Sequence, residues 1–109
     1  MDEYEVHDSG EHVTGTGGML KDASSNSKPR FTLIDLRFLT RFAQHMTKGA
    51  AKYSPNNWRK ADPSEREGFQ DSAYRHLVQW LAGMEDEDHA AAICANVMMF
   101  EATKGNETA

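Results

Sequence analysis

Apolar side chains recur at helical spacing along three stretches of the chain, at about residues 35–52, 63–82 and 85–104. Intervals of three and four residues bring such side chains to one side of an α-helix, because the helix has about 3.6 residues per turn. Basic residues lie opposite this apolar face in the first stretch. The pattern predicts an all-α fold, a small bundle of three main helices after a disordered or irregular N-terminal lead-in.

Residues that favour helix ends mark the boundaries of these stretches. Asp35 is expected to cap the first helix, because its side chain can accept hydrogen bonds from the free N–H groups at a helix start. The second helix is expected to begin after Asp62, with Pro63 at its first position and Glu65 completing a capping box. A tight turn at Gly83 is then expected to join the second and third helices.

The first 30 residues contain few large apolar side chains and many glycines and serines, which predicts coil. We therefore divide the chain into a lead-in at 1–30, a helical domain at 31–104 and a short tail at 105–109. Residues 1–12 hold five of the 17 acidic residues and no Lys or Arg, which leaves 12 acidic and 12 basic residues in the body. The acidic segment is either a solvated tail or a partner-binding arm.

Composition narrows the class of protein. A chain of 109 residues with 39% hydrophobic residues supports one domain with one modest core, which a homo-oligomer would help to complete. The single cysteine excludes an intramolecular disulfide. Neither an apolar run of about 20 residues nor a signal-peptide pattern is present, so we expect a cytoplasmic protein without membrane contact. The balanced body also lacks the basic surface typical of proteins that bind nucleic acid polymers.

The segment between the first two helices combines a turn with chemistry-bearing side chains. The run Ser54-Pro55-Asn56-Asn57 predicts a turn, because proline fixes φ and asparagine tolerates left-handed backbone. Trp58 in this polar loop either fills the core or offers a flat surface to a ring such as a nucleobase. Just before the turn, Lys48 and Lys52 either form a solvated helix face or contact phosphate groups.

Four consecutive carboxylates, Glu85 to Asp88, stand at the expected start of the third helix. Acidic residues there can simply complement the helix dipole. Alternatively, Glu85 and Asp88 lie three residues apart, on the side that carries His89 and Asn96, and clustered carboxylates suit a cation. An oxygen-lined site favours Mg²⁺ over zinc. Zinc at His76 and His89 is the less favoured hypothesis, because no cysteine is near and the HExxH spacing is absent.

Three runs of the chain, TKGAAKYSPNNW, DSAYRHLVQWLAG and EDEDHAAAICAN, resemble a known family. They are similar to the motifs KGAxKYGxxNW, DSAxRHLxxYLxG and DEDHxAAxxxN of the small phage-encoded dATP/dGTP diphosphohydrolases of the MazZ type, in the same order. The resemblance covers roughly residues 17–102. It implies an all-α, usually oligomeric protein related to the MazG-like nucleotide pyrophosphatases. Such proteins use Mg²⁺ to split a deoxypurine triphosphate into monophosphate and pyrophosphate.

The same resemblance assigns six residues to substrate binding. Lys48, Lys52 and Tyr53 belong to the KGAxKY motif, Asn57 and Trp58 to the NW that follows it, and Arg75 to the RHL motif. It assigns the helix that begins with the DEDH motif, through Asp86, Asp88, His89 and Asn96, to holding or orienting the metal.

The chain departs from the family pattern at several positions. The ExxE motif of MazG-like proteins has no counterpart in the first helix, so Asp71 is the expected substitute carboxylate beside Glu85, Asp86 and Asp88. Ser54 stands where glycine is usual. Hydrolysis at the α-phosphorus needs a cation, positive side chains and an oriented water, and we expect His76, His89 and Asn96 to be the catalytic residues.

The leading hypothesis is therefore Mg²⁺-dependent hydrolysis of dATP and dGTP to the monophosphate and pyrophosphate. By resemblance, such an activity tunes the nucleotide pool of a phage in the cytoplasm of its host. Two alternatives remain open. The missing ExxE motif is consistent with a module that binds nucleotide without catalysis, and the acidic tail with a small phage protein that blocks a host factor.

Overall fold

A computed structural model of the protein describes residues 12–22 and 28–106, and its contacts divide the chain into two units between Ile34 and Asp35. Each unit is described by itself. Residues 1–11, which carry the acidic run, and residues 107–109 lie outside the described part. The expectation of a solvated tail or a partner-binding arm therefore falls outside it as well.

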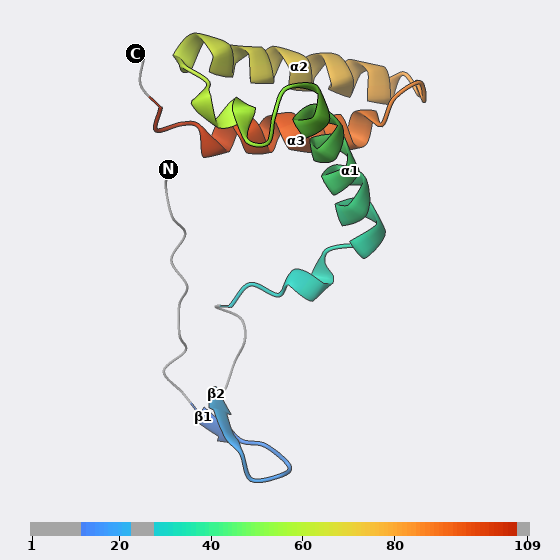
Figure 1. Ribbon diagram of the computed structural model, residues 1–109. Coiled ribbons are helices and arrows are strands. Elements are labelled where there is room, and N and C mark those ends of the chain that lie inside the picture. Colours follow the sequence, from blue (N-terminus) through green and yellow to red (C-terminus); the bar gives the residue numbers. More distant parts are fainter. Residues whose placement is uncertain (1–11, 23–27, 107–109) are drawn as a thin grey trace. The chain divides into compact units, whose positions relative to one another are not determined.

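The first unit contains a short antiparallel hairpin and one turn of 3₁₀-helix. Strand β1 (His12–Thr14) pairs with β2 (Leu20–Asp22), with His12 opposite Asp22, and η1 (Phe31–Leu33) follows (Figure 1). The glycine-rich run forms the loop between the strands, where Gly18 has a φ of +85°. The hairpin departs from the coil predicted for residues 1–30. Strands of three residues are too short to show an alternating pattern in the sequence, so they could not be predicted from it.

The second unit consists of three α-helices and a 3₁₀ turn, so the predicted all-α bundle is confirmed. Helix α1 (Leu36–Lys52) is followed by η2 (Asn57–Lys60), α2 (Pro63–Leu81) and α3 (His89–Ala102). Helices α2 and α3 run alongside each other, and α1 crosses them (Figure 1). Helix α3 packs against both of its neighbours and is the central element.

The first two helix starts lie where the capping residues predict. The Asp35 side chain accepts a hydrogen bond from the Phe38 N–H at 2.8 Å. Asp62 accepts one from the Glu65 N–H at 2.8 Å, and the Glu65 side chain accepts from the Asp62 N–H at 3.3 Å. This reciprocal pair is the predicted capping box, with Pro63 at the first helical position.

The third helix begins later than its predicted start at residue 85. Gly83, at a φ of +77°, turns the chain after α2 ends, and α3 begins only at His89. Asp88 is its N-cap and accepts a hydrogen bond from the Ala91 N–H at 3.1 Å. The three preceding acidic residues therefore belong to the connection between the helices. Periodicity does not locate a helix start, and the acidic run contains two aspartates, Asp86 and Asp88, that can each cap a helix.

The buried core of this unit is small and centred on α3. Its buried residues are small apolar or polar ones: Ala61, Ala91, Ala92, Ala95, His89, Asn96 and Thr103. Small side chains let packed helices approach closely. Several larger apolar side chains stay exposed, among them Leu36, 74% exposed, and Trp80, 52% exposed. None of the described helices has the length and apolar character needed to cross a bilayer.

Two polar contacts fasten the end of α3 to the rest of the unit. The Arg66 guanidinium of α2 donates to the Phe100 carbonyl and to the Thr103 hydroxyl, both at 3.2 Å. Beyond the helix, the Asn106 side-chain amide donates to the carbonyls of Arg59 and Ala61, at 2.8 and 2.9 Å. The segment after α3 thereby holds η2 in place.

Candidate functional site

The segment between α1 and α2 makes one wall of the largest cavity described. Asn56 adopts the left-handed conformation predicted for the turn, with a φ of +63°. Ser54 has a φ of +153°, in a region that favours glycine. These unusual angles reverse the chain within a few residues and lead directly into η2. The turn therefore places Asn57 and Trp58 over α2 and α3.

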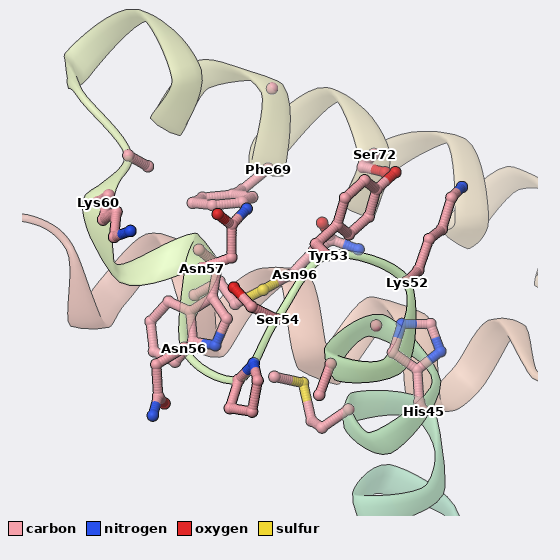
Figure 2. Close-up of a pocket in the computed structure, with 18 of the residues that line it drawn as sticks. His45, Lys52, Tyr53, Ser54, Asn56, Asn57, Lys60, Phe69, Ser72 and Asn96 are labelled. Atoms are coloured by element: carbon pink, nitrogen blue, oxygen red, sulfur yellow. The ribbon is translucent and has the colours of Figure 1, made fainter.

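The cavity has a volume of about 1090 Å³ and lies among the end of α1, η2, α2 and α3. Lys52 and Lys60 stand on opposite sides of it, with Phe69, Asn57 and Tyr53 between them (Figure 2). Both cationic and aromatic groups thus face one concave site. Ligand sites typically have this size and this mixture of apolar surface and a few polar groups.

Six of the residues predicted from the sequence line this cavity: Lys52, Tyr53, Asn57, Trp58, His76 and Asn96. Trp58 is half-buried, and the Arg59 guanidinium lies over its ring at 4.4 Å from the centroid. The Trp58 side chain is therefore neither buried in the core nor fully exposed to solvent, and it forms part of the cavity wall. The Asn96 amide donates to the Ala92 carbonyl at 2.8 Å, which fixes its orientation within α3.

Two predicted substrate residues lie outside the cavity lining. Lys48 is exposed on α1, one turn before Lys52. Arg75 on α2 donates to the Ser72 hydroxyl at 3.0 Å, and Ser72 does line the cavity. Arg75 is therefore one residue removed from the site, whereas Lys48 lies on α1 outside the lining.

A histidine pair connects α2 with the start of α3. The Nδ1 atoms of His76 and His89 are 2.9 Å apart, and the Nε2 atom of His89 is 2.8 Å from Asp86 Oδ1. His89 is only 2% exposed. Burial lowers the pKa of His76, an effect opposed by Glu87 and reinforced by His89 and Arg75. The hydrogen bond from His89 likewise holds the pKa of Asp86 below its usual range.

A smaller hollow has a volume of about 370 Å³, and Glu85, Glu87, Asp88, His89 and Arg41 are among its lining residues. His76 borders the large cavity, whereas His89 borders the small hollow.

Asp88 is held by a bidentate ion pair with α1. Arg41 donates through Nε to Asp88 Oδ2 and through a terminal nitrogen to Oδ1, both at 2.8 Å. The hydrogen bond from Arg41 is the main cause that lowers the pKa of Asp88 to about 2. Both carboxylate oxygens are thus engaged by a cation from the protein itself.

The four carboxylates predicted as magnesium ligands do not converge in this structure. Asp71 is exposed on α2 and lines neither hollow, Glu85 borders the small hollow, Asp86 bonds His89, and Asp88 bonds Arg41. The residues therefore do not fit an all-oxygen site for a resident Mg²⁺ ion.

Among the described residues, one group of three or more potential ligands does converge, and it comprises His76, Glu87 and His89. The sequence analysis did not single out Glu87 as a potential ligand or Arg41 as the partner of Asp88. The position of Glu87, two residues before His89, was the available signal for the first. No local signal pointed to the second, since 47 residues separate the pair.

Fold and cavity together define a small all-α domain with a concave cavity among the end of α1, η2 and the antiparallel helices α2 and α3. The family model described as dATP/dGTP diphosphohydrolase, N-terminal, matches residues 20–108. The chain belongs to this family, which confirms the resemblance found in its motifs. No curated protein and no solved structure matches the chain.

Proposed function

We propose that this protein hydrolyses dATP and dGTP to the monophosphate and pyrophosphate, with the nucleotide bound in the large cavity. The observation that carries the proposal is the cavity itself. It has a volume of about 1090 Å³ and gathers lysine, aromatic and amide side chains within a chain of the dATP/dGTP diphosphohydrolase family. A deoxynucleoside triphosphate offers a matching set of phosphates, an aromatic ring and polar edges.

The layout of the cavity supports one orientation of the nucleotide. Lys52 and Ser72 lie on one side, and Arg75 adjoins that side through its hydrogen bond to Ser72 (Figure 2). These groups suit the triphosphate, because charge-assisted hydrogen bonds to phosphate oxygens are strong. Phe69 lies nearer to Lys60, on the side where the purine ring can stack.

The amide side chains supply hydrogen bonds of both polarities to the nucleotide. Asn57 projects between the two ends of the cavity, and Asn96 rises from α3 beneath Tyr53 (Figure 2). An amide both donates and accepts, which suits a purine edge or a sugar hydroxyl. Both side chains can therefore hydrogen-bond the base or the sugar of a bound nucleotide.

The reaction adds water across the bond between the α- and β-phosphoryl groups. Water attacks the α-phosphorus, the bond to the bridging oxygen breaks, and pyrophosphate leaves. Of the predicted catalytic residues, His76 and Asn96 border the cavity. His89 is not among the lining residues but contacts His76 through the Nδ1 atoms of the two rings. This arrangement supports a role for His76 and Asn96 in orienting the reacting groups, with His89 as a positioning residue.

Magnesium enters this proposal as part of the substrate. Mg²⁺ is commonly bound through substrate phosphates together with few protein carboxylates. The engagement of Asp86 by His89 and of Asp88 by Arg41 supports this assignment over a resident magnesium site.

The test is pyrophosphate release from dATP, dGTP, dCTP and dTTP by the purified protein, with and without Mg²⁺. We expect release from the two purine nucleotides only, and only with Mg²⁺. Release from none of the four nucleotides, while dATP or dGTP still binds by calorimetry, would replace this proposal with the non-catalytic binding module. Absence of both release and binding would remove the cavity as a nucleotide site.

We also propose that the protein is a homo-oligomer. Large apolar side chains on the outside of α2 and α3 support this, including Tyr74, Leu81 and Val97, which are 70%, 71% and 51% exposed. Contiguous exposed apolar surface is typical of interfaces. Light scattering coupled to size-exclusion chromatography would give the mass, and a mass of 12.2 kDa would contradict the proposal. The role in tuning a phage nucleotide pool stays a prediction from the family.

A further inference from the structure

His76, Glu87 and His89 bring two imidazoles and a carboxylate to one point. His76 lies in the second half of α2, Glu87 in the connection after it, and His89 is the first residue of α3. One ligand atom from each lies within 4.8 Å of the other two. The fold therefore assembles this trio from three successive segments, without any contribution from α1 or the hairpin unit.

The orientation of His89 fits that of a metal-binding histidine. Its Nε2 atom is 2.8 Å from Asp86 Oδ1, so the N–H of the ring is accounted for by that carboxylate. Its Nδ1 atom is then left with a lone pair and faces His76 Nδ1 at 2.9 Å. Metal-bound histidines commonly donate their other N–H to a carboxylate, which fixes the tautomer and the ring orientation. Asp86 occupies that outer position here.

Burial adds to the rigidity of the arrangement. The His89 side chain is 1% exposed, whereas Asp86 is 57% exposed and reaches it from the connecting segment. A ring so enclosed loses little further freedom when it binds an ion. Without an ion, the two facing Nδ1 atoms share one proton in an N–H···N hydrogen bond, and this is the competing explanation of their contact.

We infer that His76, Glu87 and His89 form a binding site for a first-row divalent transition-metal ion of the zinc type, oriented by Asp86. Two imidazoles with one carboxylate suit Zn²⁺ or Co²⁺, whereas Mg²⁺ prefers oxygen ligands. Three protein ligands leave further coordination positions open. Because His76 also lines the large cavity, the ion lies at the cavity wall. The site is distinct from the magnesium that accompanies the substrate.

The test measures metal binding in the absence of nucleotide, so its result is independent of the diphosphohydrolase proposal. The chain is stripped with a chelator and titrated with Co²⁺ or Zn²⁺, following visible absorption and heat. We expect one ion per chain and a Co²⁺ spectrum typical of nitrogen and oxygen ligands. Failure to bind an ion at one per chain would overturn the inference and leave the histidine contact as a hydrogen bond.

Variants identify the ligands. Glu87→Gln is the first choice, because Glu87 is exposed and its loss leaves the buried residues untouched. We expect Asp86→Ala to weaken binding by about 10- to 100-fold, as is usual for an outer partner of a ligating histidine, and Glu87→Gln by at least as much. Glu85→Gln is the matched control in the same acidic run, and His45→Gln is the control for a neighbouring histidine.

His76→Gln and His89→Gln complete the set, with far-UV circular dichroism to verify the helices. Affinity retained in folded His76→Gln would overturn the assignment. Equal losses in Glu85→Gln and Glu87→Gln would also overturn it, since they would indicate diffuse attraction of the ion to the acidic run.

Discussion

Arg41 and Asp88 lie 47 positions apart in the chain and form two parallel hydrogen bonds of 2.8 Å that join α1 to the first turn of α3. Asp88 has a second task there, because its Oδ1 atom also accepts the Ala91 N–H and caps the helix. One carboxylate thus fixes both where α3 begins and where α1 packs on it.

This relationship predicts a specific dependence of stability on pH. The pKa of Asp88 is about 2 in the folded chain, below its ordinary value of 3.8, so its contribution to stability is full above the ordinary value and is lost as the pH falls through 2. Because the pair is partly exposed to solvent, we expect Asp88→Asn to cost only about 1 kcal/mol at pH 7. Asparagine retains the capping ability.

Urea unfolding of the wild type and Asp88→Asn at several pH values measures this contribution. The two free energies of unfolding should converge near pH 2. A double-mutant cycle with Arg41→Met assigns the effect to the pair, with Arg37→Met on the exposed side of α1 as control. A difference that does not change with pH would contradict the ion pair as its source.

Lys52 is expected to bind the triphosphate, because it lines the cavity beside Ser72. Lys52→Met should reduce kcat/KM for dATP by about tenfold or more, the equivalent of one charge-assisted hydrogen bond. Lys48→Met should have a smaller effect, since Lys48 is not among the lining residues. Steady-state kinetics of both variants, with Lys104→Met as a distant control, would decide; equal losses at Lys48 and Lys52 would refute the proposed position of the phosphates.

Trp58 offers a direct signal for nucleotide binding. Its indole is part of the cavity wall, so a purine stacked nearby should quench its fluorescence. The chain has two tryptophans, and the second, Trp80, borders the small hollow instead. We expect dGTP to quench the wild type and Trp80→Phe, but not Trp58→Phe. Quenching that survives in Trp58→Phe and disappears in Trp80→Phe would instead place the nucleotide at the small hollow.

Ser54 carries backbone strain that glycine would relieve. Its φ of +153° is unfavourable for a residue with a Cβ atom. Ser54→Gly should therefore raise the free energy of unfolding by about 1 kcal/mol. Ser64→Gly, in the first turn of α2, is the matched control and should lower it, because glycine is unfavourable in a helix. Thermal unfolding of both variants measures the difference; a less stable Ser54→Gly variant would show that the serine side chain outweighs the strain.

Helix ends were predictable where a single residue carried the local chemistry. Asp35 and the Asp62 to Glu65 capping box begin their helices as expected, because a cap involves only residues within one turn. The start of α3 was not predictable, since the acidic run contains two aspartates, Asp86 and Asp88, either of which can cap a helix. The residue that does cap α3, Asp88, also forms an ion pair with Arg41 of α1, a contact that local sequence does not reveal.

The candidate site was predictable to the extent that it is local in sequence. Lys52, Tyr53, Asn57 and Trp58 lie within seven positions, and one turn brings them to the same cavity. The convergence of Glu87 with the two histidines depends on how the connection after Gly83 folds back over α2. Helical periodicity carries no information on that path. The roles assigned to these side chains stay predictions until they are measured.

The hydrogen bonds from Asn106 to the carbonyls of Arg59 and Ala61 have a consequence for the order of events during synthesis. During synthesis, η2 emerges from the ribosome about 45 residues before Asn106, whose side chain holds it in place. Until that later segment emerges, the wall lacks its tether, and a nascent chain carries an unfinished pocket. Premature termination just before Asn106 would therefore give a protein with all three helices and a loosened binding site.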